Sequence, residues 1–158
     1  MYLCGDLPPG SLEEVLGRYG VNVAWVGDGE DIPGSHWDAP EAGMIRGRLY
    51  VRADTPVHSA LHEGGHLVCM GPDRRRTVHT DAGGDDLEES AVCYLQILLA
   101  GELAVGSARL MRDMDDWGYS FRLGSTKRWF EEDAEDAREW LDAQGLTRGG
   151  VLLARSVS

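Results

Sequence analysis

The first third of the chain alternates apolar and polar residues in a way that predicts short β-strands. Residues 21–26 (VNVAWV) are apolar and rich in β-branched side chains, and the turn sequence GDGED follows them. Residues 44–52 (MIRGRLYVR) predict a hairpin or a bent strand around Gly47, in which Leu49 and Val51 share one face. The chain is therefore expected to form a small β-sheet near its N-terminus.

Elsewhere, apolar residues recur with the spacing of amphipathic helices. A short helix is expected over residues 11–19, with Ser11 and Glu14 forming a capping box at its start. Longer helices are expected over residues 57–70, 87–103 and 126–143, and the stretch DMDDWGYSF is expected to be irregular. Since no linker or internal repeat interrupts these elements, they predict one α+β domain over residues 1–158, mostly helical in its C-terminal half.

The composition is that of an acidic protein. The 158 residues include 27 Asp and Glu against 15 Lys and Arg, which gives a formal net charge of −12 at pH 7. Such a chain repels nucleic-acid phosphates and anionic membranes, so neither is expected as a partner. No stretch is apolar enough to span a bilayer, and the N-terminus lacks the pattern of a signal peptide. With three widely spaced cysteines, expected to be reduced thiols, these features predict a cytoplasmic protein.

One motif carries candidate chemistry: HEGGH, residues 62–66, in a stretch expected to be helical. Residues four apart lie on one face of a helix, so His62 and His66 can bind one metal ion, most simply zinc (Zn²⁺) with an open position for water. Zinc lowers the pKa of that water, and Glu63 can then act as general base and pass the proton to a leaving amine. A helical wheel puts these three side chains on a polar face and the two glycines on an apolar back, where a neighbouring element can approach closely.

The third protein ligand is expected on the helix of residues 87–103. Glu88 projects from the buried face of that helix, where a carboxylate is costly unless it is paired or binds a metal, so Glu88 is the predicted ligand. Glu89 projects about 120° away, towards solvent, and is an alternative. His79 is a further alternative, although a solvated histidine is the simpler interpretation in its polar loop.

HEGGH followed by a helical glutamate resembles the gluzincin-type zincin metallopeptidases, and the compact ImmA/IrrE-type family in particular. In that family a strand and a short loop lead into the HExxH helix, and a later helix carries the pattern E-x-x-A-(N/D)-x-(F/Y)-A. The segment RLYVRADTPVHSALHEGGHLV has the first arrangement, and EESAVCYL places Glu88, Ala91 and Tyr94 at matching positions. Val92 stands where the family has Asn or Asp, so a hydrogen bond that supports a ligand histidine is expected to be lost. The resemblance implies a zincin-like fold, with the small sheet packed on the HExxH helix.

These features together predict a zinc-dependent metallopeptidase that hydrolyses peptide bonds in a narrow intracellular protein substrate. Its metal ligands would be His62, His66 and Glu88, and Glu63 would be catalytic. The alternative is a degenerate zincin that binds zinc and acts as a non-catalytic regulatory partner, since a small chain leaves little room for a deep cleft. A third possibility is that HEGGH binds no metal. The oligomeric state is left open.

Two nearby features have competing interpretations. Trp117, Tyr119 and Phe121 can line a substrate cleft, with the Tyr119 hydroxyl stabilising an oxyanion, but core packing is the simpler interpretation. Three arginines at residues 74–76 can hold a carboxylate of a substrate or partner, or can form a solvated loop that offsets local negative charge.

Overall fold

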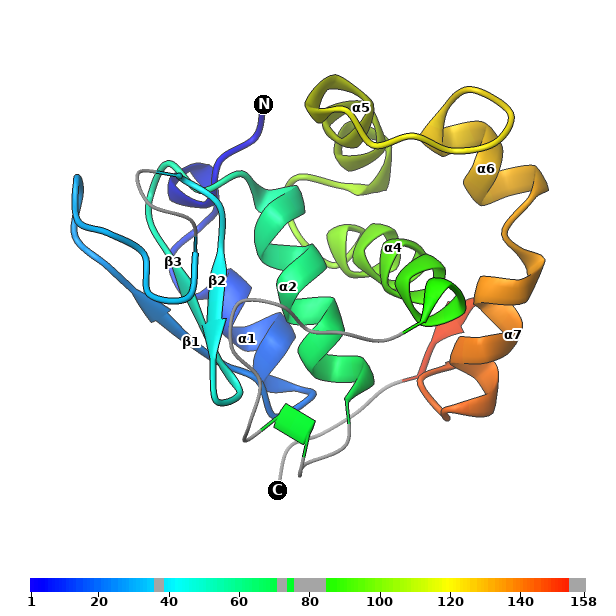
Figure 1. The fold of residues 1–158 in the computed structure, drawn as a ribbon, viewed down its shortest axis with the longest axis horizontal. Coiled ribbons are helices and arrows are strands. Elements are labelled where there is room, and N and C mark those ends of the chain that lie inside the picture. Colours follow the sequence, from blue (N-terminus) through cyan, green and yellow to red (C-terminus); the bar gives the residue numbers. More distant parts are fainter. Residues whose placement is uncertain (36–38, 71–73, 76–84, 154–158) are drawn as a thin grey trace.

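The computed structural model describes residues 1–35, 39–70, 74–75 and 85–153, which form the α+β architecture that the sequence predicts (Figure 1). The elements, in chain order, are η1 (Cys4–Asp6), α1 (Ser11–Gly17), β1 (Asn22–Trp25), β2 (Gly43–Ile45), β3 (Arg48–Val51), α2 (Val57–Cys69), α4 (Asp86–Ala100), α5 (Ser107–Trp117), α6 (Thr126–Glu132), α7 (Glu135–Ala143), β4 (Thr147–Arg148) and β5 (Val151–Leu152). None of the helices in these ranges is long and apolar enough to cross a membrane.

The N-terminal sheet has the strand order β1–β3–β2. The expected hairpin is confirmed: β2 pairs with β3 in antiparallel fashion, and the side chains of Leu49 and Val51 are both fully buried. Its turn residues Arg46 and Gly47 have φ angles of 51° and 84°. Positive φ at both central positions is typical of the two-residue hairpin turn that matches strand twist, which explains the glycine. β1 then joins β3 in parallel, with Val23 opposite Leu49.

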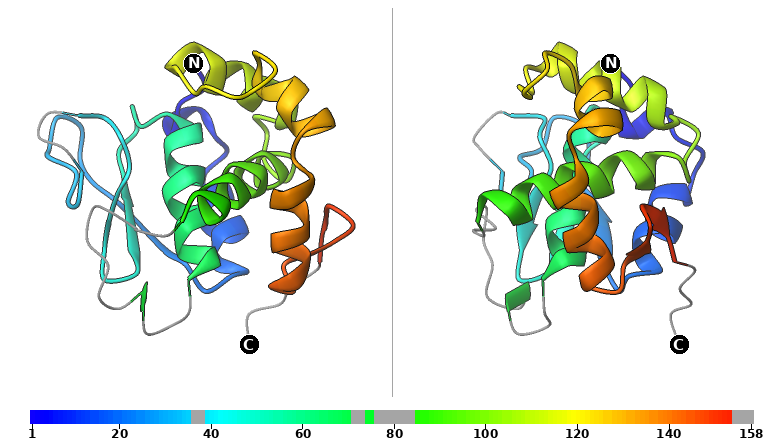
Figure 2. Two further views of the ribbon diagram at one scale, coloured as in Figure 1. Left: turned by 45° about the vertical axis from the view of Figure 1, so that its right-hand side comes forward. Right: turned by 90° about the vertical axis from the view of Figure 1, so that its right-hand side faces the viewer.

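The helix that carries HEGGH, α2, lies between this sheet and α4 (Figures 1 and 2). At both glycines of the motif, a larger residue would crowd a side chain of a neighbouring helix. A Cβ atom at residue 64 would lie 3.1 Å from the Leu16 methyl groups, and one at residue 65 would lie 3.2 Å from Cγ1 of Val92. The two glycines therefore let α1 approach α2 from one side and α4 from the other.

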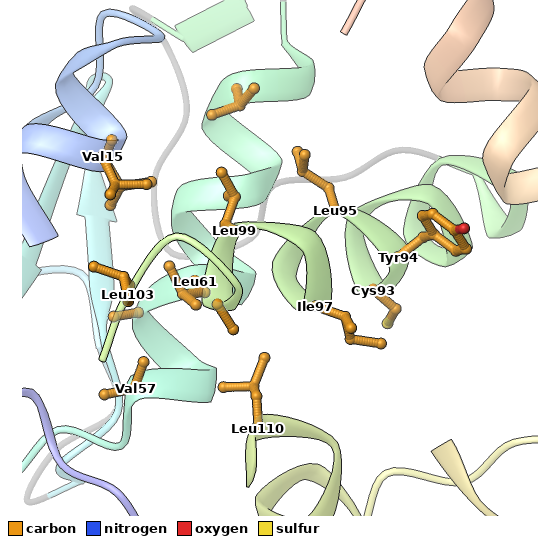
Figure 3. Packing of buried hydrophobic residues seen from close by; sticks show 14 of the residues in the cluster. Val15, Val57, Leu61, Cys93, Tyr94, Leu95, Ile97, Leu99, Leu103 and Leu110 are labelled. Carbon is orange, nitrogen blue, oxygen red and sulfur yellow. The ribbon is translucent and has the colours of Figure 1, made fainter. Parts of the chain in front are cut away.

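The hydrophobic core gathers where α2 crosses α4 (Figure 3). Leu61 of α2 and Leu95 and Leu99 of α4 are fully buried at this crossing. Cys93 and Ile97 leave α4 on the side that faces α5. Apolar contacts thus enclose the second half of α4. The charged side chains of this helix lie in its first turn.

The starts of α1 and α4 are capped differently. The side chain of Asp85 caps α4 by accepting a hydrogen bond from the Glu88 N–H at 2.8 Å. The capping box of the first helix is wrong, because Gly10 occupies the cap position and the Ser11 hydroxyl donates to the Pro8 carbonyl at 2.8 Å.

Two expectations for the C-terminal half are also wrong. The stretch expected to be irregular is so only from Gly118 onwards, because its first five residues continue α5, whose Leu110 and Met114 lie one turn apart and are fully buried. The single helix expected over residues 126–143 is two helices that break at Asp133 and Ala134. The break is required because α6 packs against α5, whereas α7 packs against α4.

Candidate metal centre

The two histidines of HEGGH converge on one carboxylate, which belongs to Glu89. The Nε2 atom of His62 lies 2.8 Å from Glu89 Oε1, and the Nε2 atom of His66 lies 2.8 Å from Glu89 Oε2. One ligand atom from each of the three residues lies within 4.8 Å of the others. Two imidazole nitrogens and one carboxylate oxygen are the donor set of catalytic zinc sites that keep a fourth position open.

Glu88, the predicted third ligand, lies outside this cluster. Its side chain is buried, as the helical wheel predicts, but its carboxylate accepts hydrogen bonds from Arg74 Nη1 at 2.9 and 3.0 Å. Arg74 thus supplies the partner that a buried carboxylate requires. The side chains of Glu89 and Gln96 on α4 both reach the histidines of α2, so the structure brings the alternative, Glu89, to the histidines.

Gln96 is a site residue that the sequence analysis missed. It is fully buried, accepts a hydrogen bond from His62 Nδ1 at 2.7 Å, and donates from Nε2 to the His58 carbonyl at 3.1 Å. A proton on Nδ1 leaves the Nε2 lone pair of His62 free for a metal. One signal in the sequence could have identified it: Gln96 is an amide side chain on an otherwise apolar stretch of helix, seven residues and therefore about two turns after Glu89.

The second histidine has less support. The Nδ1 atom of His66 is buried and has no hydrogen-bond partner among the residues that the structure describes. The two histidines therefore differ at Nδ1: Gln96 accepts a hydrogen bond from His62, whereas the Nδ1 atom of His66 has no such partner in the described part of the chain.

The charges of the site influence one another strongly. Burial raises the pKa of Glu63, and the imidazoles of His62 and His66 offset only part of that rise. Hydrogen bonds from the same two imidazoles lower the pKa of Glu89. Burial lowers the pKa of His62, but Cys93 and Glu89 outweigh it and bring that pKa well above its ordinary value. A proton on His62 thus holds its imidazole against the Glu89 carboxylate, and a cation can replace that proton because metal binding and deprotonation are coupled.

A pocket of about 360 Å³ opens beside the cluster. Its lining consists of His62, Glu89, Ser90, Cys93, Trp117, Tyr119, Ser120 and Phe121. Tyr119 Oη lies 3.2 Å from His58 Nδ1, and the Tyr119 ring meets the His62 ring edge-on at 6.0 Å. The aromatic segment lines this pocket, and it also packs within the chain, since Phe121 stacks on Trp129 with ring centroids 4.5 Å apart.

The arginines after α2 make contacts within the chain. Arg74 binds Glu88, as described above, and Arg75 donates from Nε to the Leu67 carbonyl at 2.5 Å near the C-terminal end of α2. Arg76 and His79, the other residues considered there, lie outside the described residues. The structure therefore gives Arg74 and Arg75 internal roles in the chain.

Comparison of the chain with protein-family models, with curated proteins and with solved structures found no match. What defines the candidate site is its own geometry. His62, His66 and Glu89 offer three ligand atoms to one point, and Glu63 stands next to them on α2.

Proposed function

We propose that this chain is a zinc-dependent metallopeptidase of zincin-like fold, with His62, His66 and Glu89 as the metal ligands. The observation that carries the proposal is the convergence of both histidine Nε2 atoms on the Glu89 carboxylate, at 2.8 Å each. The donor set suits zinc, which when bound supplies the Lewis acidity that activates water towards a peptide carbonyl.

The chain's own residues have distinct tasks in this proposal. Glu63 takes the proton from the attacking water and returns it to the leaving amine, a task that suits a carboxyl whose pKa burial raises. Gln96 fixes the ring of His62 by accepting from Nδ1. The Tyr119 hydroxyl lines the same pocket, where it can donate to the carbonyl oxygen of a bound substrate.

The proposed substrate is a narrow set of peptides or proteins in the cytoplasm. The three cysteines, Cys4, Cys69 and Cys93, are free thiols in the structure, a state that a reducing compartment preserves. The net charge of −12 favours partners other than nucleic acids and anionic membranes.

The direct test is cleavage by wild type and by Glu63→Gln, followed by mass spectrometry of peptides from an unfolded protein. We expect Glu63→Gln to retain the zinc content of wild type but to lose about 10²–10⁴-fold in cleavage rate, the usual contribution of a general base. Glu135→Gln, which changes an exposed residue of α7, is the matched control and should cleave at the wild-type rate. Equal cleavage by wild type and Glu63→Gln would show that the proposed mechanism is wrong.

A second candidate function is zinc-dependent binding of a regulatory partner without catalysis. The observation that favours it is the buried Nδ1 atom of His66, which lacks a hydrogen-bond partner in the described part of the chain. A ligand histidine whose other ring nitrogen lacks a hydrogen bond binds a metal more weakly, and activity falls with it. This candidate predicts zinc in the wild type, no cleavage that depends on Glu63, and a stable partner recovered by both wild type and Glu63→Gln.

A further inference from the structure

A large, partly exposed aromatic side chain lines the pocket beside the candidate metal centre. Trp117 is the last residue of α5, and 44% of its surface is exposed. Its ring lies 5.0 Å from the ring of His58, a buried residue of α2, so the indole is held at the pocket rather than projecting freely. An exposed aromatic residue that lines a hollow next to reactive groups is well placed to contact a ligand.

The wall that continues from Trp117 is held in place by stacked aromatic rings. Tyr119 stacks with Phe121, and Phe121 stacks on Trp129 of α6 with ring centroids 4.5 Å apart. Trp129 in turn meets Tyr94 of α4 edge-on at 6.3 Å. This packing orders the wall before any ligand binds. The entropic cost of ordering the site on binding is therefore smaller, which favours affinity.

The charge around the pocket indicates which peptides it favours. Ser90 borders both this pocket and a neighbouring hollow of about 390 Å³. That hollow is lined by Asp86, Asp133 and Asp136 against one cation, Arg122, which itself pairs with Asp133. In a chain of net charge −12, the surroundings of the pocket are therefore complementary to basic residues.

We propose that this pocket selects the substrate: it takes an aromatic or large aliphatic side chain next to the scissile bond of a peptide with neighbouring basic residues. Trp117 is the residue that determines this specificity, through contact between the indole and the bound side chain. The inference rests on the proposed peptidase function, since it assigns the substrate class of the same cleft. A volume of about 360 Å³ is at the small end of ligand pockets and suits one large side chain with its peptide unit.

The test is calorimetric binding of blocked hexapeptides to Glu63→Gln protein that is kept metal-free with EDTA. The peptides share two lysines and differ at one position, which is Phe, Leu, Ala or Asp. We expect the Phe peptide to bind at least about tenfold more tightly than the Ala peptide, with Leu between them, because the apolar area buried decreases in that order. Replacing both lysines by glutamates should weaken the Phe peptide further, and high salt should reduce that difference.

Variants of Trp117 test its assignment. In the Glu63→Gln background, Trp117→Ala should bring the affinity for the Phe peptide down to that for the Ala peptide, whereas Trp117→Phe should keep most of the preference. Trp25→Ala is the matched control, because Trp25 is 42% exposed on β1 and is not among the residues that line the pocket. It should leave all affinities unchanged.

The outcomes separate this inference from the proposed function. Equal affinity for the Phe and Ala peptides, or a Phe preference that survives Trp117→Ala, would overturn the pocket assignment even if cleavage depends on Glu63. A Phe preference that is lost in Trp117→Ala would support it even if no zinc-dependent cleavage is found, in which case the peptidase function alone would be wrong.

Discussion

Glu88 and Glu89 are neighbours on α4 whose carboxylates have different partners. Glu88 is buried against Arg74, and Glu89 bridges His62 and His66. Loss of a direct ligand should weaken zinc binding by more than the roughly 10–100-fold that loss of a supporting partner costs. We therefore expect Glu89→Ala to lose its zinc and Glu88→Ala to retain about one zinc per chain.

This difference can be measured by elemental analysis of proteins purified without added metal, followed by zinc titration of the apo forms. Glu88→Ala is the matched control, because it removes an adjacent carboxylate from the same helix turn. Retention of zinc by Glu89→Ala together with its loss from Glu88→Ala would show that the original ligand prediction was right.

His58 couples stability to pH. The pKa of His58 is lowered from 6.5 to about 4: burial is the main cause, the charge of Asp113 on α5 opposes it, and the neighbouring charge of His62 adds to the lowering. Because the folded-state pKa is depressed, the unfolded chain binds the proton first as the pH falls. The contribution of neutral His58 is thus complete above about pH 6.5 and is lost between pH 6.5 and 4, at a rate approaching 1.4 kcal/mol per pH unit.

Urea unfolding of metal-free wild type and His58→Asn at several pH values between 7.5 and 4.5 checks this expectation. The free energy of unfolding should fall more steeply for wild type than for the variant, since the other titrating groups are common to both. Parallel curves below pH 6.5 would contradict the depressed pKa of His58.

At the scale of elements, the contact between α2 and α4 sets the distance between the histidines and Glu89. A Cβ atom at Gly65 would already lie 3.2 Å from the fully buried Val92, so the branched side chain of Gly65→Val must push the helices apart. We expect it to lower the free energy of unfolding by about 1–3 kcal/mol, the range for an overpacked core, and to weaken zinc binding as well.

Chemical denaturation and zinc titration measure the two effects. Gly17→Ala is the control, since a Cβ atom there meets nothing within 4 Å at the end of α1. It should stabilise the chain by about 0.4–1 kcal/mol and leave zinc binding unchanged. If Gly65→Val is destabilised but binds zinc with wild-type affinity, the contact between α2 and α4 at Gly65 does not control the geometry of the metal centre, and this prediction is wrong.

The whole molecule gains stability from any ligand that binds the folded state alone. The three candidate ligands come from two helices that meet only on folding, so zinc should raise the melting temperature in a concentration-dependent way. The gain is about 2.7 kcal/mol at a free zinc concentration 100 times the dissociation constant. Scanning calorimetry with added zinc or with EDTA checks this, and Glu89→Ala should show no such difference.

Much of the fold could be predicted from local pattern. The hairpin of residues 44–52 and the helices around HEGGH and Glu88 have spacings that do not depend on distant partners. The failures have a common cause, since the break at Asp133 and the helical state of Asp113 depend on which helix each segment packs against. Periodicity alone contains no information about that choice.

The sequence by itself determined that His62, Glu63 and His66 share one face of a helix, because helical geometry fixes residues one to four apart. It also determined that Glu88 lies on a buried face. Only the tertiary structure decided that Glu89 meets the histidines and that Gln96 supports His62. The physical reason is that side-chain packing around Gly64 and Gly65 sets the rotation and crossing of α2 against α4. This packing brings together segments that are far apart in the chain, and local pattern does not specify it.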